Sequence, residues 1–196
     1  MAATLEGDAA MTKTADAGPA FLPGDRPADA RVARIIRVDQ AGEFGAVRIY
    51  AGQRAVLRQG KAADAIELMA AQEAVHLETF DRLIVERRVR PTALRPLWHV
   101  GGYAMGAATA LLGEKAAMAC TAAVEEVIDE HYAGQLAELG QSDLELSDII
   151  EEYRADEAEH RQTALGHGAR DALAYPVLTA AVKSASRVAI WLSERF

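Results

Sequence analysis

Strand-like alternation of hydrophobic and polar positions is absent from this chain, and helix-forming residues dominate from about Ala28 onward. From that point proline occurs only at Pro91, Pro96 and Pro176, and each of these residues marks a boundary between helices. The pattern predicts helices over residues 28–58, 62–88, 115–139, 143–166 and 171–194. The sequence therefore predicts an all-α chain.

The predicted helices form two hairpins joined by a long apolar crossover, residues 89–114. Gly140 fits a helix stop, and Ser142 with Glu145 three residues later fits a capping box for the next helix. Residues 1–27 are rich in Ala, Gly, Asp and Pro without apolar periodicity, which predicts a flexible arm. We expect one folded domain over residues 28–196.

Two of the five histidines follow a glutamate by three residues: Glu73 precedes His76, and Glu157 precedes His160. Residues three apart lie on one helical face, so each pair can offer a carboxylate oxygen and an imidazole nitrogen to one metal ion. An isolated pair of this kind is more often a solvated helix face, because glutamate is common on helices. Whether these two pairs bind metal therefore depends on which residues the other helices place beside them.

The spacing of two further glutamates supports a metal centre. Glu43 precedes Glu73 by 30 residues and Glu125 precedes Glu157 by 32, so each interval spans one hairpin. At about 1.5 Å per residue, all four positions lie at a similar height in a bundle. A weak repeat also places Tyr50 and Tyr132 seven residues after Glu43 and Glu125. One Glu from each of two helices plus Glu-x-x-His from two others is the ligand set of ferritin-like di-iron proteins.

The sequence thus predicts a ferritin-like four-helix bundle around a carboxylate-bridged pair of metal ions. Its predicted ligands, which are also the predicted catalytic residues, are Glu43, Glu73, His76, Glu125, Glu157 and His160. Buried carboxylates need neutralisation, and two divalent irons would balance four of them. Carboxylate and imidazole suit iron or manganese, and only the oxygen chemistry discussed below favours iron.

Several neighbours of these residues allow two interpretations. Asp156 is either an exposed acid or the acceptor of a hydrogen bond from a ligating histidine on the neighbouring helix. Gly42 and Gly45 flank Glu43 inside a helix, where glycine costs up to about 1 kcal/mol against alanine. Close helix packing is our preferred explanation, and a substrate approaching the backbone is the other. His131 is a candidate for the approach to the site, whereas His99 and His167 fit core or surface roles.

Composition excludes several other classes of function. The formal net charge of -8 argues against nucleic-acid binding, and the single cysteine, Cys120, excludes an internal disulfide framework or a Cys-rich metal site. No secretory signal or organelle transit pattern is visible at the N-terminus. A cytoplasmic protein is the simplest interpretation.

Two apolar segments form two additional helices and suggest contact with a membrane surface. Residues 96–113 carry no formal charge, yet their glycines and His99 argue against a membrane span. The C-terminal segment AYPVLTAAVKSASRVAIWLSERF is similarly apolar. A basic cluster precedes the first segment and suits an anionic bilayer: Arg82, Arg87, Arg88, Arg90 and Arg95. Alternatively, both segments simply cover the bundle.

Several motifs together resemble the demethoxyubiquinone hydroxylases of ubiquinone biosynthesis. They are RIIRVDQAGEFGAVRIYAGQ, QEAVHL, RVRPTALRPLWHVGGYAMGAATALLGEKAAMACTAAVEE, DEAEH and RVAIWLSERF, and the resemblance covers residues 31–196. It implies a peripheral membrane di-iron monooxygenase that hydroxylates the ring of a demethoxyubiquinone-type precursor. The six predicted ligands all match the family pattern, and Tyr132 and His131 match positions near the proposed quinone route.

The resemblance further implies two Fe ions per chain, with O2 and NADH-derived electrons as co-substrates. The chain shows no G-x-G-x-x-G fingerprint, so NADH needs an unrecognised site or a separate reductase. The implied location is the cytoplasmic face of a bacterial inner membrane, or the matrix face in mitochondria. Other ubiquinone-biosynthesis proteins and a second copy of the chain remain open as partners.

Two alternatives remain at this point. A ferritin- or rubrerythrin-like ferroxidase or peroxidase would use the same six ligands, although the apolar segments argue against it. A metal-free adaptor that delivers quinone lipids to partners would need the apolar segments alone.

Overall fold

The computed structural model describes residues 30–196, which form six α-helices and one short 3₁₀ helix, without any strand in that range. In chain order they are α1 (Ala30–Val56), α2 (Lys61–Glu86), α3 (Arg95–Leu111), α4 (Glu114–Leu139), α5 (Leu144–Gly166), η1 (Ala169–Asp171) and α6 (Tyr175–Ser193). The predicted all-α architecture is confirmed. The predicted arm, residues 1–27, lies outside the described residues.

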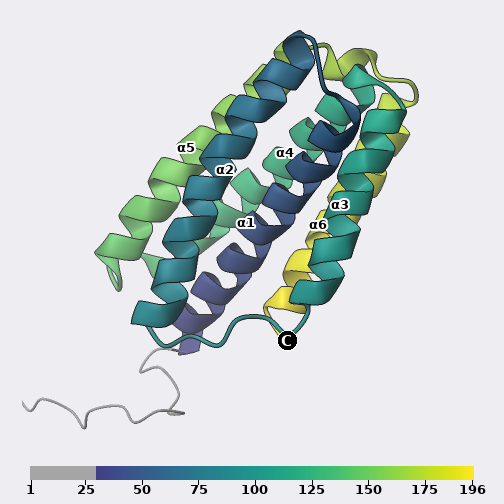
Figure 1. The fold of residues 1–196 in the computed structure, drawn as a ribbon. Coiled ribbons are helices and arrows are strands. Elements are labelled where there is room, and N and C mark those ends of the chain that lie inside the picture. Colours follow the sequence, from purple (N-terminus) through teal and green to yellow (C-terminus); the bar gives the residue numbers. More distant parts are fainter. Residues whose placement is uncertain (1–29) are drawn as a thin grey trace, which may run out of the picture.

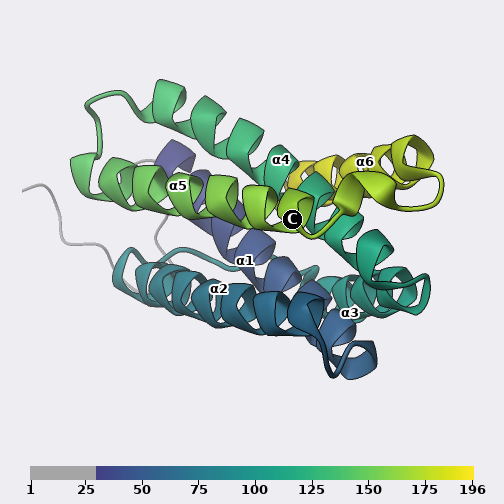
Figure 2. The same cartoon turned by 90° about the horizontal axis from the view of Figure 1, so that it is seen from above.

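Four long helices form the bundle, and two shorter helices lie along one side of it (Figure 1). α1 packs on α2, and α4 packs on α5, which gives the two predicted hairpins. α3 packs mainly on α1, whereas α6 packs mainly on α4 (Figure 2). Within residues 30–196, no helix is both long and apolar enough to cross a membrane.

Glycines allow α3 to lie unusually close to α1. A Cβ built on Gly106 would stand 1.9 Å from the carbonyl oxygen of Ile49, and one on Gly52 would stand 2.2 Å from that of Tyr103. No side chain larger than hydrogen fits at either position. The glycines of the crossover segment therefore bring its helix against the backbone of α1.

Two helix starts differ from the sequence-based prediction. The cap of α5 is Asp143, whose carboxylate accepts a hydrogen bond from the Leu146 amide at 3.1 Å. The predicted Ser142 capping box is wrong, because the Ser142 hydroxyl instead donates to the Leu139 carbonyl at 2.6 Å. The last helix starts at Tyr175 rather than Asp171, since Pro176 fits only a first helical turn and a 3₁₀ turn precedes it.

Apolar clusters fill both ends of the four-helix bundle. Phe80, Leu83 and Leu146 belong to the cluster at one end, and Ile66 and Met118 belong to the cluster at the other. Buried charged and polar side chains occupy the middle of the bundle between them. The two apolar ends thus hold four helices in register around a polar centre.

Candidate metal centre

The structure brings all six predicted ligands together at mid-height in the bundle. α1 contributes Glu43, α4 contributes Glu125, and α2 and α5 each contribute a Glu-x-x-His pair. Ligand atoms of Glu43, Glu73, His76 and Glu157 lie within 4.8 Å of one another, and so do those of Glu73, Glu125, Glu157 and His160. Each set has the size and chemistry of one metal position.

Glu73 and Glu157 belong to both sets and therefore lie between the two positions. His160 Nδ1 is 3.0 Å from Glu73 Oε1, and Glu157 reaches both histidines, at 3.5 Å from His76 Nδ1 and 3.4 Å from His160 Nδ1. Glu43 and Glu125 belong to one set each. Glu73 and Glu157 would therefore be within reach of both ions, with Glu43 and His76 completing one position and Glu125 and His160 completing the other.

Unpartnered polar atoms indicate that the cluster is built for cations. All six side chains are buried, and eight of their oxygen and nitrogen atoms lack a hydrogen-bond partner. These atoms are Glu43 Oε2, Glu73 Oε1 and Oε2, His76 Nδ1, Glu125 Oε2, Glu157 Oε1 and Oε2, and His160 Nδ1. Buried orphaned acceptors are costly unless a ligand satisfies them, so the residues present fit a pair of divalent metal ions.

The two tyrosines of the repeat cross between the halves of the bundle. Tyr50 on α1 donates its hydroxyl proton to Glu125 Oε1 on α4 at 2.8 Å. Tyr132 on α4 donates to Glu43 Oε1 on α1. Each phenol occupies one oxygen of a carboxylate and leaves the other oxygen facing the cluster. The repeat found in the sequence is therefore an exchange of hydrogen bonds between the hairpins.

Both histidines are also held from the opposite helix. His76 Nε2 lies 3.1 Å from Asp156 Oδ2, which is the neighbouring-helix contact suggested by the sequence. His160 Nε2 lies 3.0 Å from Gln72 Oε1, a contact that the sequence reasoning missed. Aligning QEAVH with DEAEH could have found it, since Gln72 and Asp156 each directly precede the glutamate. With Nε2 engaged, Nδ1 of each ring faces the cluster.

Burial and mutual repulsion set the protonation of the metal-free cluster. Burial and the Glu157 charge raise the pKa values of Glu73 and Glu125 well above the normal range. Burial alone would raise the pKa of Glu157 as well, yet the nearby imidazoles of His160 and His76 lower it to about 2. Burial opposes the charge on His76, but the nearby carboxylates of Glu157 and Glu43 raise its pKa to about 10. Protons thus offset the carboxylate charge when no metal is bound.

Of the two residues assigned to the quinone route, only Tyr132 touches the cluster. His131 is partly exposed and lies in a separate polar group, where its Nε2 is 2.8 Å from Gln135 Nε2. Gln135 in turn donates to the buried Asp39 at 2.6 Å. His131 therefore lies beside the cluster without reaching it, at a small surface hollow that also contains Trp191.

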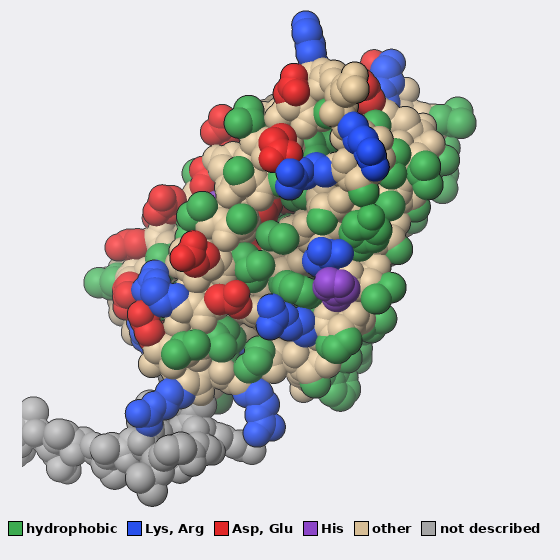
Figure 3. All heavy atoms as spheres, viewed as in Figure 1, with side chains coloured by type: hydrophobic (Ala, Val, Ile, Leu, Met, Phe, Trp, Pro, Cys, Tyr) green, Lys and Arg blue, Asp and Glu red, His purple; other side chains and the backbone are tan. Residues whose placement is uncertain are grey.

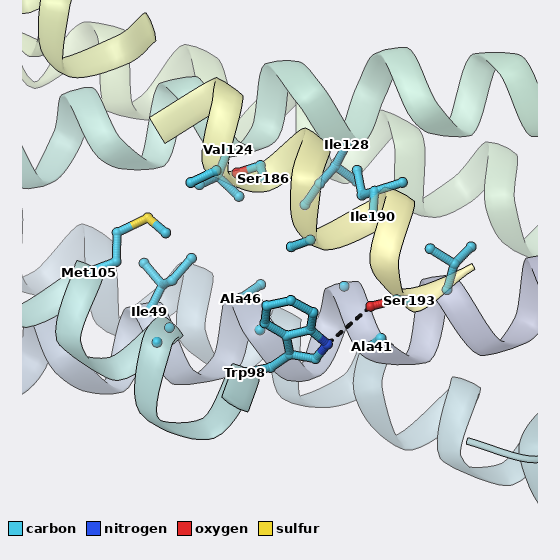
Figure 4. A pocket seen from close by; sticks show the side chains of 17 residues that line it. Ala41, Ala46, Ile49, Trp98, Met105, Val124, Ile128, Ser186, Ile190 and Ser193 are labelled. Carbon is cyan, nitrogen blue, oxygen red and sulfur yellow. Dashed lines mark hydrogen bonds between the residues drawn. The ribbon is translucent and has the colours of Figure 1, made fainter. Parts of the chain in front are cut away.

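An apolar cavity of about 260 Å³ lies where α1, α3, α4 and α6 face one another (Figure 4). Ile49 on α1, Met105 on α3, Val124 and Ile128 on α4 and Ile190 on α6 line it. The Trp98 indole donates to the Ser193 hydroxyl at 3.0 Å across one end of the cavity. The cavity thus separates α3 from α6 and borders the turns that carry Glu43 and Glu125.

Gly42 and Gly45 line this cavity, which changes our interpretation of them. A Cβ built on either glycine meets nothing within 4 Å. Close helix packing, the preferred explanation from the sequence, therefore does not require glycine at this pair, although the Gly45 carbonyl oxygen lies 2.9 Å from a Cβ built on Gly102 of α3. Their missing side chains instead leave room for a bound molecule against the backbone beside Glu43.

Comparison with known proteins assigns the family. The family model described as "Ubiquinone biosynthesis protein COQ7" matches residues 30–193. The chain belongs to the COQ7 family. A protein of Rhodospirillum rubrum named 3-demethoxyubiquinol 3-hydroxylase is 56% identical over 175 residues, covering 89% of this chain and 82% of that protein.

Mitochondrial relatives agree with this assignment. The human protein named NADPH-dependent 3-demethoxyubiquinone 3-hydroxylase is 51% identical over 175 residues, covering 87% of this chain and 81% of the human one. The Saccharomyces cerevisiae protein named 5-demethoxyubiquinone hydroxylase is 47% identical over 179 residues, covering 83% of this chain and 77% of its own. The resemblance to demethoxyubiquinone hydroxylases is confirmed, and the chain is an enzyme of the hydroxylase class.

Proposed function

We propose that this chain is a membrane-associated di-iron monooxygenase that hydroxylates the ring of a demethoxyubiquinone-type quinone late in ubiquinone biosynthesis. The observation that carries the proposal is a double set of four buried ligands that share Glu73 and Glu157, with an apolar cavity bordered by α1 and α4, the helices that carry Glu43 and Glu125. Residues 28–196 form the ferritin-like hydroxylase domain in this proposal. The family assignment supplies the reaction class.

The six side chains would hold two iron ions, with Glu43 and His76 serving one ion and Glu125 and His160 serving the other. When bound, iron supplies the electrons and open coordination positions that O2 reduction requires. One oxygen atom is inserted into a ring C–H bond and the other leaves as water. A reduced nicotinamide dinucleotide supplies two electrons and one proton, in keeping with the names of the mitochondrial relatives, and the second proton comes from solvent.

The protein's own groups orient the centre and keep water out. Tyr50 and Tyr132 each occupy one carboxylate oxygen, so Glu125 and Glu43 turn their other oxygen toward the metal. The apolar clusters at both ends of the bundle close the site to bulk water. Low polarity around the centre strengthens these charged interactions and protects the reaction from side chemistry.

The apolar cavity is the site that we assign to the quinone ring. Its volume of about 260 Å³ suits a small ring with its substituents, and its walls are almost entirely aliphatic. Trp98, Ser186 and Ser193 supply the few polar atoms that can orient ring oxygens. The isoprenoid tail leaves between α3 and α6, toward the outside of the bundle.

An exposed apolar surface on α3 and α6 supports membrane attachment. Figure 3 shows apolar side chains gathered over the α3 side of the molecule and acidic side chains mainly over the α2 and α5 side. The exposed apolar residues of α3 and α6 are Leu97, Val100, Tyr103, Leu111, Val177, Val188 and Trp191. A helix with such a face lies in the interfacial layer of a bilayer. The location we propose is the cytoplasmic face of a bacterial inner membrane, or the matrix face in mitochondria.

The basic cluster seen in the sequence contributes only in part to this surface. Arg82 pairs with Glu86 at 3.2 Å, and Arg87 pairs with Asp143 at 3.0 Å and Glu145 at 2.6 Å. Arg95 instead lies over the Phe44 ring, 4.6 Å from its centroid, at the α3 side. Arg95 therefore lies beside the exposed apolar surface of α3, where it would meet anionic lipid headgroups.

Hydroxylation by reconstituted protein tests the proposed reaction. Protein loaded anaerobically with ferrous iron is given a demethoxylated quinone, O2 and a reduced nicotinamide dinucleotide, and the product is identified by mass spectrometry. We expect one added oxygen in the ring and no turnover by Glu125→Ala, whose helicity is checked by circular dichroism. Turnover by this variant would contradict the assignment of Glu125.

The same preparation separates the alternatives. A ferroxidase would mineralise added iron without needing quinone, and a metal-free adaptor would bind quinone while holding no iron. We expect about two irons per chain and quinone-dependent O2 consumption. An iron content well below two per chain, in carefully reconstituted protein, would contradict the proposed di-iron centre.

Vesicle flotation tests the membrane surface. The double variant Val100→Asp/Trp191→Asp changes side chains that are 66% and 52% exposed on α3 and α6. The matched control, Leu68→Asp/Val85→Asp, changes residues of α2 that are 70% and 75% exposed. We expect only the first variant to lose binding to vesicles containing phosphatidylglycerol. Equal loss in both variants, or in neither, would exclude α3 and α6 as the attachment surface.

A further inference from the structure

The two halves of the metal centre share a geometry but differ in one charge. His76 is held by Asp156 and His160 is held by Gln72, each partner lying directly before the glutamate of the opposite helix. The two contacts are of nearly equal length, 3.1 Å and 3.0 Å, and both involve Nε2 of the ring. The chain thus repeats one arrangement with a carboxylate on one side and a neutral amide on the other.

Both contacts select the same tautomer of histidine. A carboxylate and an amide oxygen are acceptors, so Nε2 of each ring carries the proton that it donates. Nδ1 then has a free lone pair, and in both residues this atom is buried without a hydrogen-bond partner. Asp156 and Gln72 therefore orient both imidazoles in the same way toward the metal positions.

The charge difference makes the two imidazoles unequal donors. A hydrogen bond to an ionised acceptor is roughly twice as strong as one between neutral groups, and it draws the Nε2 proton away from the ring. Electron density on Nδ1 rises accordingly, and the metal bound there is held more tightly. An amide oxygen orients the ring without this gain.

We infer that Asp156 and Gln72 are positioning residues that make the two metal positions unequal, so that a divalent ion binds more tightly beside His76 and Glu43 than beside His160 and Glu125. The inference rests on the proposed di-iron centre. No other side chain among residues 30–196 contacts Nε2 of either histidine at hydrogen-bond distance.

The experiment exchanges the charge without changing the shape of either side chain. Asp156→Asn removes the carboxylate, Gln72→Glu introduces one, and Glu159→Gln removes an exposed carboxylate of α5 that contacts neither histidine. Asp156 is 32% exposed and Gln72 lies on the exposed side of α2, so neither variant perturbs the core. Each full chain, freed of metal, receives one equivalent of ⁵⁷Fe(II) anaerobically and is measured by Mössbauer spectroscopy, alongside an Fe(II) binding titration.

We expect wild type and Glu159→Gln to place most of the first iron in one spectral component. Asp156→Asn should weaken the tighter step about 10-fold and populate both components, because outer hydrogen-bond partners of metal ligands typically contribute 10- to 100-fold in affinity. Gln72→Glu should equalise the components by strengthening the weaker step. The double variant Asp156→Asn/Gln72→Glu should reverse the order of filling.

Equal filling in wild type, or identical filling in wild type and both single variants, would overturn the inference. Failure of every protein to bind two irons would overturn the proposed di-iron centre together with it. Unequal filling that follows the charge, in protein that does not hydroxylate the quinone, would refute the proposed reaction and leave this inference intact.

Discussion

The metal cluster and the apolar cavity both border α1 and α4, and they differ in almost every physical respect. The cluster gathers four buried carboxylates and two imidazoles, whereas the cavity is lined by aliphatic side chains and bare glycine backbone. On α1, Glu43 belongs to the metal cluster, whereas its neighbours Gly42 and Gly45 line the cavity. A buried polar cluster and an apolar cavity can therefore border the same two helices, each lined by the side chains that suit it.

The two regions also make opposite demands on stability. A buried cluster of like charges destabilises the folded chain unless protons or metal ions neutralise it. The apolar cavity carries little electrostatic cost, but the side chains that line it lack the packing contacts that a filled core would provide. Changes at the cluster should therefore alter metal content and pH dependence, while changes at the cavity should alter substrate binding alone.

The largest effect is expected from removing a carboxylate that belongs to both metal positions. Glu157→Ala deletes the group that lies between the two histidines, so each proposed metal position would lose a ligand. We expect iron content below one per chain and at least about a 1000-fold loss of hydroxylation, because metal ions contribute several kcal/mol to such chemistry. Glu152→Gln, an exposed acid of the same helix, is the control for charge. Two irons retained in Glu157→Ala would show that Glu157 is not a shared ligand.

Filling the cavity should separate the two regions. Gly45→Leu places a side chain where an added Cβ meets nothing within 4 Å, so the variant should fold. We expect a gain in stability of up to about 1 kcal/mol from helix propensity, two irons per chain, and at least about a 100-fold loss in kcat/KM for the quinone. Gly134→Ala on α4, which is equally unobstructed and lies outside the cavity, should gain stability without losing activity. An unchanged kcat/KM in Gly45→Leu would show that the quinone ring does not bind in this cavity.

In the metal-free chain, the pH dependence of stability should reveal the shifted pKa values of the cluster. Glu73 and Glu125 keep their protons in the folded chain above the ordinary value of 4.5, and His76, with a pKa of about 10, keeps its own above 6.5. The folded chain then binds more protons than the unfolded chain, so the free energy of unfolding falls as pH rises above 4.5. The slope is about 1.4 kcal/mol per pH unit for each proton of difference.

Thermal unfolding with and without metal measures this effect. We expect the Tm of the metal-free protein to fall between pH 5 and 9, and added Mn(II) under anaerobic conditions to raise it more at higher pH, because metal displaces these protons. The Glu126 carboxyl is a contrast within the molecule, since Lys183 lowers its pKa and its small contribution is lost as pH falls below 4.5. If the Tm of the metal-free protein rises between pH 5 and pH 9, the raised pKa values of Glu73, Glu125 and His76 are contradicted.

The sequence could predict the polar region but not the apolar one. Glu-x-x-His spacing and the equal heights of Glu43 and Glu125 are local properties of helices, and the structure brings all six side chains together. The cavity depends on how α3 and α6 dock, and nothing in the spacing of Trp98, Ser186 and Ser193 shows that they meet. The same limit explains why Gly42 and Gly45 were misread, since an empty volume leaves no pattern in the chain.

The smallest effect is expected at the hydrogen bond that closes one end of the cavity. Trp98→Phe keeps an aromatic ring but removes the indole N–H that reaches Ser193 at 3.0 Å. One hydrogen bond contributes about 1 kcal/mol, so we expect KM for the quinone to rise by about 3- to 10-fold with kcat and iron content unchanged. Ser193→Ala should have the same effect, and combining the two changes should add little more, because both remove one interaction. Fully additive effects would mean that the two residues contact the substrate separately instead of holding α3 to α6.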